Sequence, residues 1–192
     1  MATTENKVKY GLKNVHYAVI TPGEDGAVTY GTPVHIPGAV NLSLRAQGDE
    51  TKFYAEDVAY YVTTANDGYS GDLEIAVIPD AFRKDVLKEA EDETDKVLVE
   101  RSNVETARFA LLFEFNGDVK ATRHVLYNCS CSRPSITSST INNAKTPSTD
   151  TLPVTASPLS DGRVKAKTTS GTSEEKYNGW YKTVWEPAGA GV

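Results

Sequence analysis

The sequence of 192 residues is poor in the residue types that most often carry chemistry. It contains two Cys, three His, one Met and two Trp. No apolar run approaches the ~20 residues that a membrane-spanning helix needs. A secretory signal has a basic segment followed by an apolar one, and residues 1–15 do not show this pattern. We therefore expect a protein that has no membrane span and that begins in a cytoplasm.

The sequence also lacks an excess of positive charge. Its Lys and Arg number 20 and its Asp and Glu number 26, which gives a net charge of −6. Proteins that hold nucleic acid tightly need Lys and Arg to displace counterions from phosphates. The composition therefore disfavours tight nucleic-acid binding. It still permits a contact in which the acidic protein repels the phosphates of a nucleic acid.

No catalytic constellation can be assembled from the histidines. His16, His35 and His124 fall in separate segments, and none stands beside a Ser or Cys in a nucleophile motif. The sequence has no H-E-x-x-H, no glycine-rich phosphate loop before a helix and no paired metal-ligand spacing. We expect a protein that is not an enzyme and that binds neither a cofactor nor a metal.

The two cysteines, Cys129 and Cys131, are spaced so that both thiols lie on one face of a strand. The four ligands that a structural zinc site requires are not present around them, and a disulfide between such close positions would be strained. Burial as small apolar side chains is our main interpretation, and redox or metal chemistry is the alternative.

The residues that are plentiful favour strands. Ten Tyr and many Val and Thr suit pleated surfaces, so we expect a mainly β fold. A chain of this length suits one domain, which buries roughly 70% of the surface that its unfolded chain exposes. Within a single domain over 1–192 we expect an N-terminal arm, a long loop at about 46–57, a Ser/Thr-rich segment at about 132–150 and a C-terminal arm at about 177–192.

Residues 51–96 contain the most regular pattern. Apolar and polar positions alternate over 58–63 and again over 73–78, and 66–71 between them is rich in turn residues. We predict two half-buried strands that pair antiparallel as neighbours.

A helix is predicted directly after the second of these strands. Pro79 ends the strand because it has no N–H for the ladder, and Asp80 is placed to cap a helix. Phe82, Val86, Leu87 and Ala90 then form an apolar stripe. The pattern predicts a helix from about Asp80 to Ala90 with one face against a sheet.

Alternation predicts further strands along the chain. They are a strand within 14–21, a strand through 40–44, a central hairpin over 107–131 that turns at Asn116 and Gly117, and a second hairpin that joins 152–156 to 164–166 through a turn at 160–162. The rings of Trp180, Tyr181 and Trp185 are expected to dock on the domain.

Two clusters of side chains have alternative interpretations. Phe53 and Tyr54 are the large apolar residues of the predicted loop at 46–57; they either fold back onto their own domain or anchor a neighbouring subunit. Five acids gather near the C-terminus of the predicted helix and form either a solvated loop or a patch that pairs with basic groups of another subunit. These acids are Glu89, Glu91, Asp92, Glu93 and Asp95.

Several segments, taken in order, resemble a known family. "KVKYGLKNVHYAVIT", "IPGAVNLSL", "FYAEDVAYY", "NDGYSGDLEIAVIPDAFRKDVL" and "YNCSCSRPSIT" are together similar to the major tail (tail tube) proteins of bacteriophages with long, non-contractile tails that infect Gram-positive hosts. The likeness covers nearly the whole chain, and "GDLEIAVIPDAFRKDVL" is its most specific part.

This resemblance implies a β-sandwich or open barrel with one flanking helix. It also implies that six copies close into a ring, that rings stack into the tail tube, and that genome DNA passes through the lumen without specific binding. The implied location is the virion tail, assembled in the host cytoplasm, and the implied partners are the tape-measure, tail terminator and distal tail proteins, with no membrane involved.

The resemblance also guides the choice of contact residues. For contacts between subunits we favour Phe53, Tyr54, Glu56 and Asp57, together with the N-terminal arm and the Ser/Thr-rich segment. Acids that line the lumen would repel phosphates over ~8 Å. The candidates, taken from polar faces of predicted hairpins, are Asp72, Glu74, Glu114 and Asp118.

A rival hypothesis from another class is a non-enzymatic carbohydrate-binding β-sandwich used for adhesion. Tyr54, Tyr69, Trp180 and Trp185 would be its sugar-stacking rings. Such a module would bind glycans as a monomer or small closed oligomer, whereas a tube subunit would polymerise without any ligand.

Overall fold

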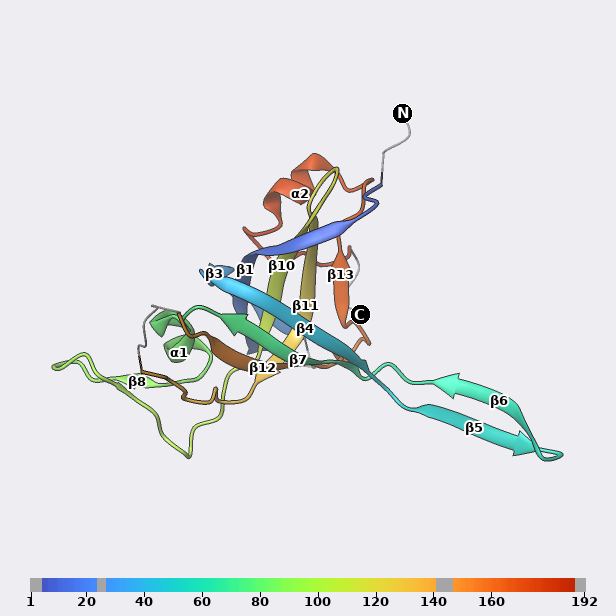
Figure 1. The fold of residues 1–192 in the computed structure, drawn as a ribbon, viewed down its shortest axis with the longest axis horizontal. Coiled ribbons are helices and arrows are strands. Elements are labelled where there is room, and N and C mark those ends of the chain that lie inside the picture. The colour runs from blue at the N-terminus through green and yellow to red at the C-terminus, as the bar shows by residue number, and fades with distance from the viewer. Residues whose placement is uncertain (1–4, 24–26, 141–146, 189–192) are drawn as a thin grey trace.

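The structure, a computed structural model, describes residues 5–23, 27–140 and 147–188 of the chain. It is mainly β, with short helices (Figure 1). The strands before the first helix are β1 (Lys9–Pro22), β2 (Val28–Tyr30), β3 (Val34–His35), β4 (Ala39–Gln47), β5 (Glu50–Ala55), β6 (Val58–Thr64) and β7 (Gly68–Ile75). Helix α1 (Asp80–Asp85) is followed by β8 (Ala90–Glu91), β9 (Leu98–Val99), β10 (Phe109–Gly117), β11 (Thr122–Cys131), β12 (Asp150–Ala156), β13 (Lys165–Lys167) and helix α2 (Glu174–Gly179).

One antiparallel sheet of nine strands organises the molecule. Its order is β2-β1-β10-β11-β12-β7-β4, with β3 paired to β1 and β13 paired to β11. The sheet curves so that β4, β7 and β12 cross in front of β1, β10 and β11 (Figure 1). The two layers therefore enclose a core, as the predicted sandwich with a flanking helix requires.

Strand β10 is buried on both of its faces. Phe109, Leu111 and Phe113 point into the main core between the two layers. The alternate residues Ala110 and Leu112 point to the opposite side, into a second, smaller core. The predicted central position of this hairpin is confirmed, and the sheet needs cover on both sides of β10.

Helix α1 closes one end of the main core. The Phe82 ring is fully buried and meets Tyr17 and Phe109 edge-on, with ring centroids 5.0 and 5.6 Å apart. The Tyr17 hydroxyl donates a 2.7 Å hydrogen bond to the Asp85 carboxylate, which ties the helix to β1.

The helix is shorter than the predicted span from Asp80 to Ala90. It ends at Asp85, and Lys88 takes a left-handed conformation with φ of +59°, so the chain turns back and Ala90 enters strand β8. The predicted cap is also wrong, because Pro79 is the N-cap residue and makes no side-chain capping bond. The predicted apolar stripe is confirmed at Phe82, because the helix face that carries this residue is buried against the sheet.

The predicted pairing of the two strands in residues 51–96 is wrong. Strand β6 pairs with β5, and β7 pairs with β4 on one side and β12 on the other. The predicted loop at 46–57 accordingly contains the end of β4 and the whole of β5. Leu73 and Ile75 are buried as predicted, but every residue of β6 is exposed.

The central hairpin turns after Gly117, two residues later than predicted, through 118–121. Asn6 fills this turn: its amide nitrogen donates to the Lys120 carbonyl over 2.6 Å, and its side-chain oxygen accepts from the backbone N–H of Val119 and Lys120, both over 3.0 Å. A Cβ on Gly117 would lie 2.2 Å from the Asn6 amide nitrogen. The missing side chain at Gly117 therefore admits the N-terminal segment.

The second predicted hairpin does not form as a pair. Strands β12 and β13 both exist, and a tight turn joins Leu159 to Arg163, but each strand pairs with β11 rather than with the other. The predicted docking of the C-terminal rings is confirmed, because Trp180 is buried in the second core and Tyr181 and Trp185 pack against it.

Replacing Phe82 with Ala removes the ring that joins α1 to the main core. Large-to-small changes of buried Phe cost about 3–5 kcal/mol, so we expect a loss of that order in the free energy of unfolding, measured by urea titration. The control is Val77→Ala, three residues before the helix, where the side chain is 68% exposed. A Phe82→Ala protein as stable as this control would contradict the role of α1 as a core element.

Candidate functional site

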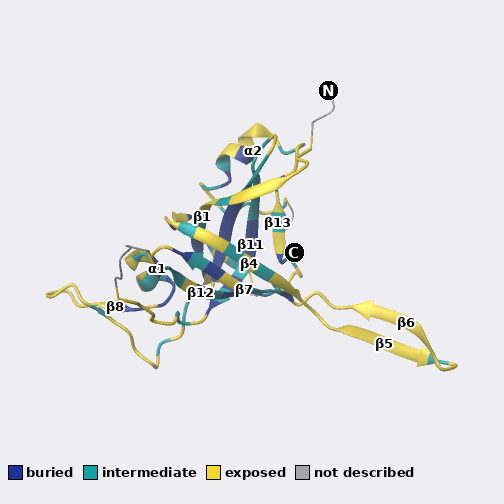
Figure 2. Cartoon of the chain, viewed as in Figure 1, coloured by how far each residue is buried: buried dark blue, intermediate teal, exposed yellow. Residues whose placement is uncertain are grey.

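The most unusual surface of the molecule is an arm formed by β5 and β6, which projects from the sheet and is exposed along its length (Figure 2). Phe53, Tyr54, Tyr60 and Tyr61 are 61%, 62%, 75% and 61% exposed. Aromatic side chains usually contribute their area to a core or an interface. We refer to residues 49–64 as the arm.

The arm is a continuation of the β4–β7 ribbon. Backbone bonds of 3.0 Å run from Asp67 N–H to the Gln47 carbonyl and from Ala65 N–H to the Asp49 carbonyl, so the ladder passes from the sheet into the arm with a bend at Gly48. Gly48 has φ of +147°, and a Cβ there would lie 2.0 Å from the Ala65 carbonyl oxygen. Only glycine allows this close crossing of the two chains.

Both faces of the arm carry large apolar groups. Phe53 pairs with Tyr61, and Lys52 pairs with Val62. Because successive residues of a strand point to opposite faces, Phe53 and Tyr61 lie on one face while Tyr54 and Val62 lie on the other. Neither face rests on the rest of the described chain.

The tip of the arm is acidic. Glu56 and Asp57 form a two-residue turn between β5 and β6, and both have positive φ, +50° and +62°. Such turns favour Asn-Gly because side chains are strained in this region. Both carboxylates are exposed, and no hydrogen bond or ion pair to another described residue satisfies them.

The four predicted interface residues therefore lie together on one arm. Phe53 and Tyr54 are on its shaft, and Glu56 and Asp57 are at its tip. The interpretation in which the two rings fold back onto their own domain is wrong, since both are more than half exposed. Their contact with another subunit stays a prediction.

The four acids that were predicted to line a lumen do not share a surface. Asp72 and Glu74 lie on the outer face of β7, and the Glu74 carboxylate accepts a 2.6 Å bond from the Thr149 hydroxyl. Asp118 lies in the β10–β11 turn and accepts a 2.8 Å bond from the Lys7 N–H. Glu114 is only 5% exposed and faces the second core, so its assignment to a lumen surface is wrong.

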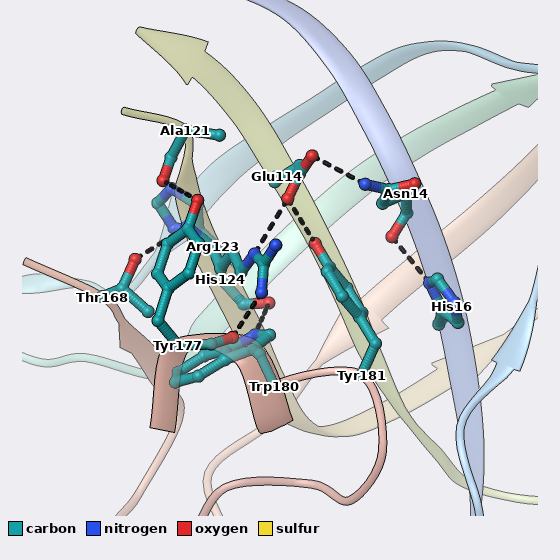
Figure 3. Close-up of polar contacts among 10 residues, drawn as sticks. All are labelled: Asn14, His16, Glu114, Ala121, Arg123, His124, Thr168, Tyr177, Trp180 and Tyr181. Atoms are coloured by element: carbon teal, nitrogen blue, oxygen red, sulfur yellow. Dashed lines mark hydrogen bonds and ion pairs between the residues drawn. The ribbon is translucent and has the colours of Figure 1, made fainter. Parts of the chain in front are cut away.

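Glu114 instead lies at the centre of a partly buried polar network (Figure 3). Its Oε2 accepts from Arg123 Nε over 3.0 Å and from the Tyr181 hydroxyl over 3.2 Å, and its Oε1 accepts from Asn14 Nδ2 over 2.7 Å. Burial, and then the nearby Glu114 charge, raise the pKa of the Tyr181 hydroxyl. The hydroxyl therefore stays protonated and acts as a donor.

The same network fastens α2 to the sheet. Arg123 Nη1 donates to the Tyr177 carbonyl, and its guanidinium lies 3.8 Å from the centre of the Tyr177 ring. The Tyr177 hydroxyl donates to the Ala121 carbonyl over 3.0 Å, and Trp180 Nε1 donates to the His124 carbonyl over 3.3 Å (Figure 3). Ala121 and the first residues of β11 thus hold the C-terminal segment over the second core.

The acidic run after α1 is largely satisfied within the chain. Glu89 is buried and pairs with Arg83 over 3.2 Å. Glu91 pairs with Lys84 over 2.7 Å, which lowers its pKa. Asp92 accepts from the backbone N–H groups of Thr94 and Asp95, and these bonds lower its pKa. Local structure therefore accounts for most of this run, and Glu93 and Asp95 are left at the tip of the β8–β9 turn.

In the part of the chain that the structure describes, the cysteines and histidines are not arranged for nucleophilic chemistry. Cys129 and Cys131 are both free and buried, and burial raises the pKa of the Cys131 thiol to about 12. His16 lies between His35 and Tyr181, with ring centroids 4.9 and 4.5 Å away, and burial lowers its pKa. Within residues 5–23, 27–140 and 147–188, no three His, Cys, Asp or Glu side chains are grouped to hold a metal ion. In those same ranges no helix has the length and apolarity to cross a membrane.

The fold defines a class, a mainly β protein built on one curved antiparallel sheet, and comparisons with known proteins do not narrow it. No family model matches the chain, and no curated protein matches its sequence. Among solved structures, the chain is similar to the tube-terminating cap of an anti-feeding prophage, determined by cryo-electron microscopy, with a TM-score of 0.36 and 9% identity over 88% of this chain and 98% of that one. A likeness at this level carries no argument about function.

Replacing Glu114 with Ala leaves Arg123 unpaired beneath the C-terminal segment. Breaking one partner of a buried pair costs about 3–5 kcal/mol, so we expect a loss of that order in urea titration and a red shift of Trp180 and Trp185 fluorescence before the main transition. The double variant Glu114→Ala/Arg123→Met removes both charges and should recover part of the loss. A double variant less stable than Glu114→Ala alone would contradict this assignment.

The environment of His124 predicts a specific pH dependence. Burial, and then Lys167, Lys165 and Lys9, lower the pKa of His124 to about 4. As the pH falls below ~6.5, the unfolded chain binds a proton at this ring before the folded chain does. The folded state should thus lose on the order of 2 kcal/mol between pH ~6.5 and ~4, a value that allows for the partly exposed ring.

The check compares urea titrations of the wild type and His124→Gln across that pH range. The two proteins should show the same loss from carboxylate protonation, and the additional loss should appear in the wild type alone. Parallel stability curves for the two proteins would contradict a depressed pKa at His124.

Proposed function

We propose that this chain is a structural virion protein, the subunit of a phage tail tube of the long, non-contractile type. In this proposal six copies close into a ring, rings stack into a tube, and genome DNA passes through the lumen. The observation that carries the proposal is the arm, whose exposed aromatic side chains are suited to burial by another protein surface.

Energetics favour a partner for the arm. An isolated two-stranded hairpin is marginally stable at best in water. Each aromatic side chain can bury roughly 150–250 Å², so the four rings of the arm, about 60–75% exposed, offer about 500 Å² of apolar surface. That is more than half of the ~800 Å² that one partner buries in a standard interface. Association would stabilise both the contact and the arm itself.

A second copy of the same chain is the partner that best fits the sheet. Strand β4 is the last strand in the sheet order, so one edge of its ladder has no partner among the described residues, and open edges invite pairing with another chain. A head-to-tail contact that closes into a ring covers such edges in every copy. The resemblance of the sequence to tail tube proteins supports the same arrangement.

The polar outer face of β7 is the candidate lumen surface. Asp72 and Glu74 on this face stand beside Ser43 and Asn41 of β4 and beside Thr151 of β12. The two carboxylates on this face would repel phosphates over ~8 Å and let DNA slide. We retain Asp72 and Glu74 as lumen candidates.

The remaining parts of the proposal follow from the same role. The protein would be non-enzymatic and without a cofactor, would be assembled in the host cytoplasm and would reside in the virion tail. The tape-measure, tail terminator and distal tail proteins would be its partners, and no membrane would be involved.

The carbohydrate-binding alternative requires its four aromatic rings to lie on one surface, and they do not. Trp180 is only 3% exposed and stacks on Trp185 with ring centroids 6.1 Å apart. Tyr69 lies under the Lys165 side chain at the base of the arm, and Tyr54 lies on the arm itself. The four rings are therefore divided among three places.

The test is the assembly of purified wild-type and arm-variant proteins, measured by negative-stain electron microscopy and light scattering over a concentration series. We expect wild-type protein to form six-fold rings or hollow tubes, and Phe53→Ser/Tyr61→Ser to remain monomeric, because the change removes one apolar face of the arm. The matched control, Val97→Ser/Val119→Ser, changes two exposed apolar residues elsewhere and should assemble like the wild type.

Since tubes can require an initiator, the series is repeated with preformed tail-tip complexes as seeds. A wild-type protein that stays monomeric with and without seeds, or an arm variant that assembles normally, would refute the proposal. Binding to a glycan array by the monomer would instead favour the carbohydrate-binding alternative.

A further inference from the structure

A basic cluster extends from the base of the arm along β13 to the start of β1, on the same molecule. It consists of Lys9 of β1 and Lys165 and Lys167 of β13. Lys167 pairs in register with His124, and Lys9 lies 5.5 Å from the centre of the Phe115 ring, which itself contacts His124. The Lys165 amine contacts the Tyr69 hydroxyl and lies 4.4 Å from the centre of that ring. The three exposed amines therefore surround one side of His124.

None of these three lysines forms an ion pair with a described residue, although Glu5 lines the same pocket as Lys167. The ion pairs of the described residues use other cations, such as Lys84, Lys120 and Arg123, and none includes Lys9, Lys165 or Lys167. The chain as a whole carries a net charge of −6, so three neighbouring lysines that form no ion pair are a local departure from its composition. Their mutual repulsion would be relieved by an anionic partner.

The acidic tip of the arm offers the complementary charge. Glu56 and Asp57 occupy both positions of a turn where their left-handed backbone is strained, at about 1–2 kcal/mol per residue. Asn-Gly would form this turn without that strain. The sequence instead places two carboxylates at the outermost point of the molecule, with no cation of the described chain beside them.

The tip cannot reach the cluster of its own chain. Tyr69, which holds Lys165, pairs with Ala46 at the root of the arm, and the strand then runs outward to Glu56. At about 3.3 Å per residue, this distance is about 30 Å. Figure 1 shows the hairpin of β5 and β6 directed away from β13. Any ion pair between tip and cluster is therefore between molecules.

We infer that the acidic tip of one copy, Glu56 and Asp57, docks on the basic cluster of a neighbouring copy, Lys9, Lys165 and Lys167. This inference rests on the proposed self-assembly and assigns it a direction. The tip of each arm meets the root of the next arm, so the contact is head-to-tail. Apolar side chains of the shaft supply burial, whereas the charges at the tip set the register.

The test is a charge exchange between two variants. Glu56→Lys/Asp57→Lys has a basic tip and a basic cluster, and Lys165→Glu/Lys167→Glu has an acidic tip and an acidic cluster. Each alone should assemble at least about tenfold less readily, measured as the concentration at half-maximal light scattering, because like charges then face each other. An equal mixture of the two should assemble like the wild type, because each tip then finds an opposite cluster on the other variant.

Controls separate charge from folding. Glu56→Gln/Asp57→Asn removes the charge while Asn still suits the turn, and it should weaken assembly less than the Lys variant does. Lys13→Glu/Lys182→Glu makes the same change in net charge at exposed lysines away from the cluster and should leave assembly unchanged. Circular dichroism melts of each monomer establish that the variants are folded. Raising salt from ~0.05 to ~0.5 M should weaken wild-type assembly, since exposed charges are then screened.

The outcomes distinguish this inference from the proposed function. If the wild type does not self-associate with or without seeds, the proposed function fails. If the wild type assembles but the two charge variants also assemble normally, or if mixing them restores nothing, the tip-to-cluster contact is wrong while self-assembly stands. If Lys165→Glu/Lys167→Glu assembles normally and only loses retention on a phosphate resin, the cluster serves a polyanion and the inference is overturned.

Discussion

The architecture depends on strand β10, which is apolar on both faces. Its odd-numbered residues from Phe109 to Phe113 require a second layer, which β4, β7, β12 and α1 supply. Its even-numbered residues require cover on the other side, which the C-terminal segment supplies through Trp180. The single acid on the strand, Glu114, is tolerated because Arg123, Asn14 and Tyr181 satisfy both of its oxygens. The two apolar faces of this one strand thus explain why a second layer covers one side of the sheet and the C-terminal segment covers the other.

The arm exposes its apolar side chains whereas the core buries them, although both are made of the same β ribbon. Strands β4 and β7 bury Leu73 and Ile75 against the other layer, while β5 and β6 present similar apolar groups to water. The change occurs at the bend where Gly48 crosses Ala65. Stability of the domain and the exposed apolar surface therefore reside in separate stretches of one hairpin, and substitutions on the arm can alter that surface with little effect on the core.

The sequence predicted the mainly β class, the central hairpin and the buried helical stripe at Phe82, because each depends on local periodicity. It could not distinguish β6 from a core strand: Val58, Tyr60 and Val62 alternate as well as Leu73 and Ile75 do, and alternation does not say what covers a face. It assigned Glu114 to a polar face because the residue that encloses it, Tyr181, lies 67 positions away. Helix α2, with six residues, is too short for a helical period to be read.

Because Gln47 and Gly68 face each other across the ladder at the root of the arm, the arm is, in topological terms, an insertion within a hairpin. A short turn between those two positions would close the ribbon and leave every core contact of β4 and β7 in place. The length, tip charge and aromatic content of the arm can therefore diverge between relatives while the sheet is conserved. Evolution can in this way change the surface that the arm exposes without altering the core of the domain.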